Sequence, residues 1–247
     1  MAASRETTKS RAAAKRKTAR ALPRESSRDR LLDSAEALFA RRGLGAVGLA
    51  EVAAKAELGK ASLFHHFPTK AHLYCAVMVR ALSYLEVELI RALAEGGPPT
   101  ARLDRWIDTF IDVLAAHPTY PGLLLRVLAD DAELPAGLPD GNEASEAVRR
   151  AITTALRLLR EGMDCGEFTR MSATHLLQTL IGAIVHPLAT GRFGEEWVGE
   201  SLLSAEQISR RKSTLRILVH SGIVTVPAHT ASLLASDSSG TPKEAPS

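Results

Sequence analysis

Cysteine is scarce in this sequence, and its two copies form no recognisable pattern. Cys75 and Cys165 lie far apart and lack the spacing of metal ligands. Isolated thiols of this kind are usually small core residues, and they fit a reducing compartment. The sequence therefore predicts no disulfide framework and no metal site, and it favours a cytoplasmic protein.

Long apolar runs and catalytic motifs are absent as well. No stretch approaches the roughly 18 apolar residues of a membrane span, and the basic N-terminus lacks the apolar core of a secretory signal. There is no GxSxG, no glycine-rich phosphate loop and no helix motif that pairs His with a carboxylate. We predict a protein without a membrane span that is not an enzyme and has no cofactor.

An enzyme with a helical fold is the alternative. Asp104 with Asp108, and Asp130 with Asp131, are candidate metal ligands, although acids on a loop or an exposed helix face are common. A divalent metal that restores hydrolytic activity after chelation would support this alternative.

Aromatic residues make up only 4% of the chain, whereas Ala and Leu are abundant. This composition favours helix over strand. A chain of 247 residues forms one large domain or two modest ones, and it is long enough to bury a core. We therefore predict an all-α fold.

The net charge of +3 conceals an uneven distribution. Residues 1–70 contain 15 Lys and Arg against 7 Asp and Glu, whereas the remainder contains 16 against 21. A basic N-terminal part joined to an acidic body is typical of a nucleic-acid-binding protein with a separate regulatory domain. Solvated charges without a function are the simpler interpretation.

The most informative stretch is LGKASLFHHFPTKAHLY, residues 58–74. Leu63 and Phe67 are four residues apart, so a short helix can bury both on one face. Pro68 ends this helix, and Thr69 can cap a long helix that runs to about residue 94. A short helix with a polar outward face suits the major groove of DNA.

Residues 30–74 resemble the DNA-binding domain of TetR-family (TetR/AcrR-like) transcriptional repressors. The matching residues are Leu31, Leu32, Ala35, Leu38, Phe39, Gly43, Val52, Ala53, Ala56, Leu58, Ser62, Leu63, Phe64, His66, Phe67, Lys70, Leu73 and Tyr74. The resemblance implies a three-helix helix-turn-helix domain, followed by a helical domain for ligand binding and dimerisation. It further implies a homodimer on a near-palindromic operator in double-stranded DNA, released by a small-molecule effector.

Three positions depart from the family's pattern. The family usually has Ser or Thr at the start of the second helix, Gly in the turn and Ser at the start of the third. This chain has Gly48, Glu57 and Gly59 there. A hydroxyl at a helix start satisfies free amides and can contact a phosphate, and glycine has no side chain to do so. These changes predict a weaker grip on DNA unless another segment contributes.

The candidate DNA-binding residues lie in and around the predicted recognition helix. They are Gly48, Lys60, Ala61, Ser62, Phe64, His65 and Lys70. Lys60, Ser62 and His65 are expected to contact base edges, because lysine donates to guanine and serine has several possible partners. The methyl group of Ala61 can meet a thymine methyl.

Phe64 and Lys70 are expected on the DNA backbone, which sets the register without selecting a sequence. Phe64 stands where the family usually has Tyr, and packing within the protein is its alternative role. His65 and His66 predict no metal site, because adjacent residues of a helix point about 100° apart.

The predicted organisation has four parts. They are a disordered basic arm at residues 1–25, the DNA-binding domain at 26–72, an effector-binding and dimerisation domain at 73–226 and a disordered tail at 227–247. The arm has eight Lys and Arg and almost nothing to bury. It either follows phosphates or the minor groove, or serves as a plain solubilising tail.

The C-terminal domain is predicted to be helical throughout. Expected helices cover about 100–116, 122–129, 144–161, 173–189 and 205–221, with a loop at 130–143. An apolar effector pocket with a few polar groups is expected among them. The candidate lining residues are Trp106, Phe110, His117, Tyr120 and Arg126, with ordinary core packing as the alternative for each.

The last two helices are the predicted dimer interface. The segment 173–189 is apolar almost all round, so it needs cover on every side, and a second subunit can supply it in a four-helix bundle. Basic residues of the last helix, Arg210, Arg211, Lys212 and Arg216, are expected to face solvent.

We predict a homodimeric repressor of the cytoplasm, bound to the nucleoid through DNA. The alternative is an architectural or partner-binding member of the family with weak sequence preference.

Overall fold

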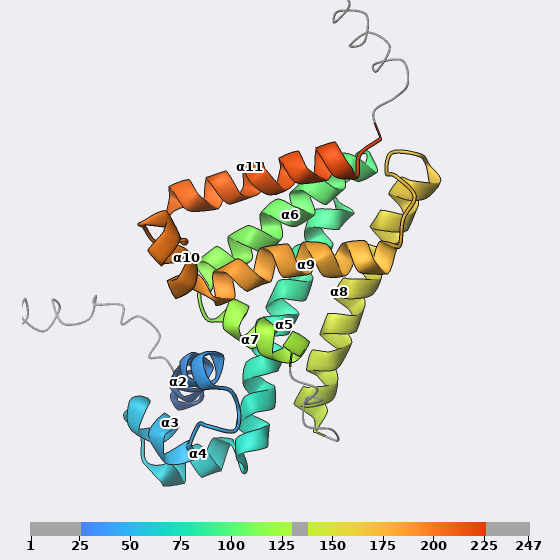
Figure 1. Ribbon diagram of the computed structural model, residues 1–247. Helices are drawn as coiled ribbons and strands as arrows, with labels where there is room; N and C mark the ends of the chain where they lie inside the picture. Colours follow the sequence, from blue (N-terminus) through green and yellow to red (C-terminus); the bar gives the residue numbers. More distant parts are fainter. Residues whose placement is uncertain (1–25, 130–137, 226–247) are drawn as a thin grey trace, which may run out of the picture.

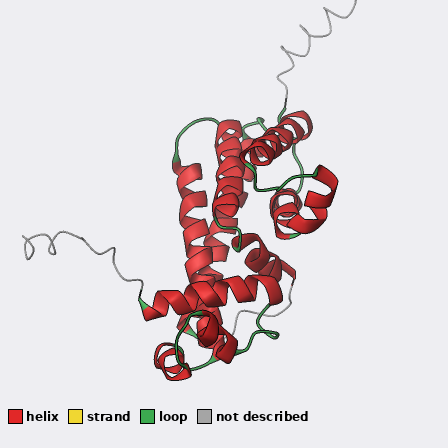
Figure 2. Cartoon of the chain, turned by 90° about the vertical axis from the view of Figure 1, so that its left-hand side faces the viewer, coloured by secondary structure: helices red, strands yellow, loops and turns green. Residues whose placement is uncertain are grey.

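The computed structural model describes residues 26–129 and 138–225, which form ten helices. In chain order they are α2 (Ser27–Arg42), α3 (Leu49–Lys55), α4 (Lys60–His66), α5 (Lys70–Ala94), α6 (Pro99–Ala116), α7 (Tyr120–Ala129), α8 (Pro139–Asp164), α9 (Ala173–Ala189), α10 (Gly191–Val198) and α11 (Ala205–Gly222). Figure 2 shows helices and loops and no strand in this part of the chain. Within the described residues the only β-type pairing is an isolated bridge between Phe168 and Val224. The predicted all-α fold is confirmed. The predicted arm at 1–25 and tail at 227–247 lie outside the described residues.

Helices α2, α3 and α4 gather at one end of α5 (Figure 1). The Ser26 hydroxyl caps α2 by accepting from the Asp29 amide at 3.1 Å, and Gly43 ends it with a φ of +73°. The ring of Phe39 meets the ring of Tyr74 from α5 edge-on, 5.1 Å between centroids. This small core therefore includes the first turns of α5.

The long helix α5 connects the small N-terminal core to the body. The Thr69 hydroxyl caps it, as predicted, by accepting from the His72 amide at 3.3 Å. Its buried residues run from Leu73 at one end to Leu93 at the other, and α6 and α8 pack along the part of α5 that lies in the body. None of the described helices is long and apolar enough to cross a membrane.

Two helices differ from the sequence prediction. Helix α8 begins at Pro139, inside the segment predicted to be a loop, because proline is favourable in the first turn of a helix. It also continues past Gly162, where the sequence predicted its end. Gly162 has no Cβ, and the ring of Phe168 occupies the space where one would lie. The short helix α10 was not predicted.

Helices α6 and α11 are joined by two ion pairs and a histidine–carboxylate hydrogen bond, which repeat every four residues. Lys212 Nζ lies 2.5 Å from an oxygen of Asp112, Arg216 lies 3.1 Å from Asp108, and His220 lies 3.0 Å from Asp104. The prediction that Lys212 and Arg216 face solvent is therefore wrong, because carboxylates on α6 stand opposite them.

Helix α9 also differs from the sequence prediction, which described this segment as apolar almost all round. Its buried face is apolar, but its outward face carries polar and small residues. They are His175, Gln178, Thr179, Gly182 and His186. In Figure 1, α9 and α11 run in opposite directions with α6 between them, and each of the two packs against α6.

Replacing Gly162 with Ala is expected to destabilise the protein. Alanine is favoured over glycine inside a helix by about 1 kcal/mol, so helix propensity alone would predict that the substitution stabilises the protein. The new Cβ would lie 2.1 Å from Cδ2 of Phe168, a side chain that is 1% exposed. Overpacking of this kind costs about 1–3 kcal/mol. Thermal unfolding should therefore show a lower Tm for Gly162→Ala. In a Phe168→Ala background, which removes every clashing atom, the same change should be neutral or stabilising, and a loss of equal size there would contradict the explanation.

Candidate DNA-binding surface and effector cavity

Helix α4 has one buried face and one open face. Leu63 is 1% exposed and Phe67 3%, and both belong to the core shared with α2 and α3. Lys60, Ala61 and His65 are exposed on the opposite side, and Ser62 is half-buried beside them. The open face of α4, which is the predicted DNA-binding surface, therefore runs from Lys60 to His65.

Phe64 takes part in packing and is also partly exposed. Its side chain is 49% exposed, and the covered part lines a small hollow together with Leu49 and Ala50 of α3. The aromatic ring thus bridges α3 and α4 while presenting an edge to solvent.

The helix starts lack side-chain caps, as the sequence indicates. Gly48 and Gly59 are extended N-cap residues of α3 and α4, and neither helix has a side-chain hydrogen bond at its cap. In the turn between them, Glu57 has a φ of 54°, a left-handed conformation that favours glycine. Arg30 stabilises this turn, because its Nη2 donates to the Ala56 carbonyl at 2.5 Å and to Glu57 at 3.2 Å.

Lys70 is engaged within the protein. Its ammonium group donates to the carbonyls of Val47 at 3.1 Å and Gly45 at 3.3 Å, in the loop that precedes α3. Lys70 therefore holds the start of α3, next to Gly48. A phosphate contact would have to share this ammonium group with two carbonyls.

The described DNA-binding unit is only weakly basic by sequence. Residues 26–70 contain seven Lys and Arg against five Asp and Glu, whereas residues 1–25 contain eight against two. Most of the positive excess of the N-terminal part thus belongs to the segment outside the described residues.

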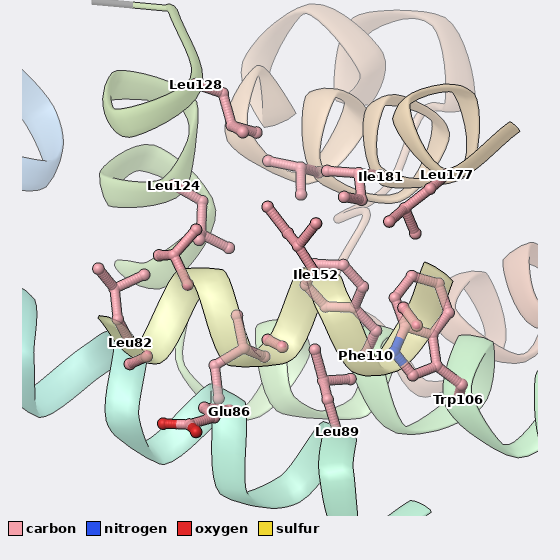
Figure 3. A pocket seen from close by; sticks show the side chains of 16 residues that line it. Leu82, Glu86, Leu89, Trp106, Phe110, Leu124, Leu128, Ile152, Leu177 and Ile181 are labelled. Atoms are coloured by element: carbon pink, nitrogen blue, oxygen red, sulfur yellow. The ribbon is translucent and has the colours of Figure 1, made fainter. Parts of the chain in front are cut away.

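The five candidate effector residues do not share one pocket. Trp106 and Phe110 line an apolar cavity of about 70 Å³ among α5, α6, α7, α8 and α9 (Figure 3). The other side chains around it are mainly aliphatic. They include Leu82, Leu85, Leu89, Leu124, Leu128, Val148, Ile152, Leu177, Ile181 and Val185. Sequence reasoning missed them because an aliphatic lining has the same periodicity as an ordinary core.

Glu86 is the acid at the wall of this cavity, and it is 7% exposed. Its carboxylate accepts two hydrogen bonds from Arg150, one of them from Nη2 at 2.8 Å. Figure 3 shows that this carboxylate points away from Ile152 and Ile181. The charge is thus neutralised outside the cavity, and the interior is apolar.

His117, Tyr120 and Arg126 lie elsewhere. The rings of His117 and Tyr120 stack at 4.5 Å, and burial raises the pKa of Tyr120 to about 12. Arg126 reaches α2, where its Nη2 donates to the Arg41 carbonyl at 2.9 Å. His117 and Tyr120 therefore belong to an aromatic group with Tyr84 of α5, and Arg126 belongs to the contact between α7 and α2; none of the three lines the cavity.

A group of charged residues joins α2 to the body. Arg80 of α5 donates to Asp33 at 2.6 Å and also to Glu36, and the Thr119 hydroxyl donates to Glu36 at 2.6 Å. Glu36 therefore links α2 to both α5 and the turn before α7. We call Asp33, Glu36, Arg80 and Thr119 the α2 joint.

Comparisons with known proteins agree with this arrangement. The family model described as "Bacterial regulatory proteins, tetR family" matches residues 31–77. The transcriptional activator FasR of Mycolicibacterium smegmatis is 34% identical over 93 residues, which cover 38% of this chain and 42% of FasR. The transcriptional repressor KstR of the same organism is 29% identical over 105 residues, 42% of this chain and 52% of KstR. The match spans about half of the length of these relatives.

Solved structures extend the likeness to the body. The ketosteroid regulator KstR2 of Mycobacterium tuberculosis superposes with a TM-score of 0.66 at 20% identity, over 81% of this chain and 96% of KstR2. AibR in complex with isovaleryl coenzyme A and operator DNA gives 0.63 at 14% identity, over 77% and 96%. Residues 31–77 thus match the TetR family of bacterial regulatory proteins, and the predicted resemblance is confirmed over these residues. The comparisons point to a transcriptional regulator and not to the enzyme alternative.

Two lysines allow a matched test of this surface. Lys60→Met should leave the Tm within about 1 °C and weaken operator binding about tenfold, because the exposed ammonium is lost and the stem remains. Lys70→Met should lower stability by about 1 kcal/mol, because two carbonyls of the 45–47 loop lose their donor. Thermal unfolding and gel shift separate the two effects. Equal behaviour of both variants in both assays would contradict the assigned roles.

Proposed function

We propose that this chain is a homodimeric DNA-binding transcriptional regulator of the cytoplasm, a repressor that a small apolar effector releases from its operator. The observation that carries the proposal is the open face of α4, on which Lys60, Ala61 and His65 are exposed above a fully buried Leu63. Two such helices, about 34 Å apart in a symmetric dimer, fit successive major grooves of a near-palindromic site.

The dimer is proposed to form through α9 and α11. A groove of about 580 Å³ lies between these helices, lined by residues such as Leu176, Leu180 and Leu215. Ile217 and Leu218 of α11 are 65% and 61% exposed. Large apolar side chains exposed to this degree beside a groove are typical of a contact with another subunit.

The effector is proposed to enter the apolar cavity. At about 70 Å³ the cavity is far below the roughly 300–1,000 Å³ of sites for organic ligands. Binding must therefore move α7 away from α8, near Leu128 and Ile152, which are both partly exposed. The wall is apolar with one paired acid, so an acyl or similarly hydrocarbon-rich effector is favoured. The acyl group in the AibR complex is of this class.

Release of DNA is proposed to follow from the position of α7 between the cavity and α2. α7 lines the cavity on one side, while the turn before it contacts α2 through Thr119 and Glu36. A shift of α7 thus disturbs the α2 joint and changes the orientation of the recognition helix. Effector binding then favours an arrangement with lower operator affinity by population shift.

A gel shift and footprint on DNA around the chain's own gene test the proposal. Full-length protein should protect a near-palindromic site. Deletion of residues 1–25 should weaken binding and reduce its salt dependence, because eight basic residues are lost, but sequence preference should remain. Loss of nearly all binding on deletion would favour the architectural alternative. The absence of a side-chain cap at the starts of α3 and α4, at Gly48 and Gly59, also favours this alternative. Weak binding that ignores sequence would contradict the repressor proposal.

A charge on α11 should abolish the dimer. Leu218→Glu places a carboxylate in the proposed interface, so we expect a monomer by light scattering and a loss of operator binding of more than tenfold. Val87→Glu is the matched control, because Val87 is 50% exposed on α5, away from the groove. A dimeric Leu218→Glu variant, or a monomeric Val87→Glu variant, would contradict the assignment.

A further inference from the structure

A second cleft lies where α2, α7 and α9 meet. Its volume is about 620 Å³, within the range of sites for small organic molecules, and it shares no lining residue with the apolar cavity. Its walls combine apolar side chains with two arginines. They include Ala37, Ala40 and Arg41 of α2, Leu125 and Arg126 of α7 and Leu188 of α9.

Arg126 has unused hydrogen-bonding capacity in this cleft. A guanidinium has five N–H donors in a planar fork, and the contact of Nη2 with the Arg41 carbonyl uses one. The Nε atom is buried and has no hydrogen-bond partner among the described residues, so the donors that a ligand in the cleft can reach are those of the two Nη atoms. Gly43 lies directly beneath the guanidinium, where a Cβ would come within 2.9 Å of Nη1. The group is thus held in place with donors to spare.

The cleft is also positive without a compensating acid. Arg41 and Arg126 are the ionisable side chains that line it, and neither has a carboxylate partner among the described residues. The nearest acid of α2 with a defined role, Glu36, is already bound by Arg80 and Thr119. A planar carboxylate matches a guanidinium fork, and the neighbouring alanines and leucines match an apolar body.

From these observations we propose that the cleft between α2, α7 and α9 binds a small organic carboxylate with a compact apolar body, held by Arg41 and Arg126. The site is separate from the apolar effector cavity. Its ligand bridges an arginine of the DNA-binding unit and an arginine of the body.

A ligand at this position has a direct mechanical consequence. α7 crosses α2 closely at Gly122, where a Cβ would lie 2.8 Å from the Ala40 carbonyl oxygen. A carboxylate bound by both Arg41 and Arg126 adds a second contact between α2 and α7, so it stabilises one orientation of α2. An effect on operator affinity rests on the proposed function, whereas binding of the carboxylate does not.

Benzoate is a suitable probe, with benzamide as a neutral control of the same shape. Calorimetric titration and thermal unfolding of the full chain should show that millimolar benzoate binds and raises the Tm, and that benzamide does neither. Arg41→Gln should weaken benzoate binding at least tenfold without loss of fold, because α2 uses the Arg41 carbonyl and not its side chain in the contact with Arg126. Arg126→Lys, which keeps the charge but loses the fork, should also weaken it.

A charge at the rim of the other cavity separates the two sites. Ile152→Asp adds no bulk that would move α7, but its carboxylate should exclude benzoate from the apolar cavity and leave binding in the cleft unchanged. Equal binding of benzoate and benzamide would overturn the proposal. So would binding that survives Arg41→Gln but is lost in Ile152→Asp. Because these measurements need no DNA, their failure is distinguishable from a failure of operator binding.

Discussion

Burial of Leu63 and Phe67 against α2 and α3 is the contact on which the DNA-binding surface depends. These two side chains fix the rotation of α4, and the rotation determines that Lys60, Ala61 and His65 face outward. The helix is seven residues long, and its cap has no side-chain hydrogen bond. Since so short a helix is marginal in isolation, tertiary packing must supply most of its stability. The rest of the unit, including the clamp from Lys70 to the 45–47 loop, supports that packing.

The body is organised so that one helix contacts both ends of the molecule. α5 contributes Leu73 and Tyr74 to the N-terminal core, and Leu82, Leu85 and Leu89 to the apolar cavity. α6 contributes Trp106 and Phe110 to the same cavity while its acids pair with α11. The cavity, the α2 joint and the groove of the proposed dimer are therefore connected through two packed helices.

The sequence predicted those parts of the fold that depend on local patterns. The Thr69 cap and the apolar stripes located α5 and α9 to within a residue. Prediction from the sequence failed where contacts between residues far apart in the chain determine the structure. Glycine at position 162 is a typical signal for the end of a helix. Here the residue lies inside α8, and its lack of a side chain leaves room for the ring of Phe168. The pairing of Lys212 and Arg216 with α6 likewise depends on packing and leaves no local signal.

The candidate sites divide in the same way. The outward residues of α4 follow from helical periodicity once Leu63 and Phe67 are placed inside. The effector residues do not, because apolar side chains that line a cavity and those that fill a core have the same spacing. Polar residues led the prediction to His117, Tyr120 and Arg126. The first two instead pack with Tyr84 of α5, and Arg126 contacts α2.

The spacing of DNA contacts tests the central claim most directly. Hydroxyl-radical footprinting of the protein on its operator should show protection of two half-sites, related by a two-fold axis and centred about one helical turn, roughly 34 Å, or a multiple of it apart. A single protected stretch without symmetry would contradict the account, because it would mean that α4 does not enter DNA as one of a symmetric pair.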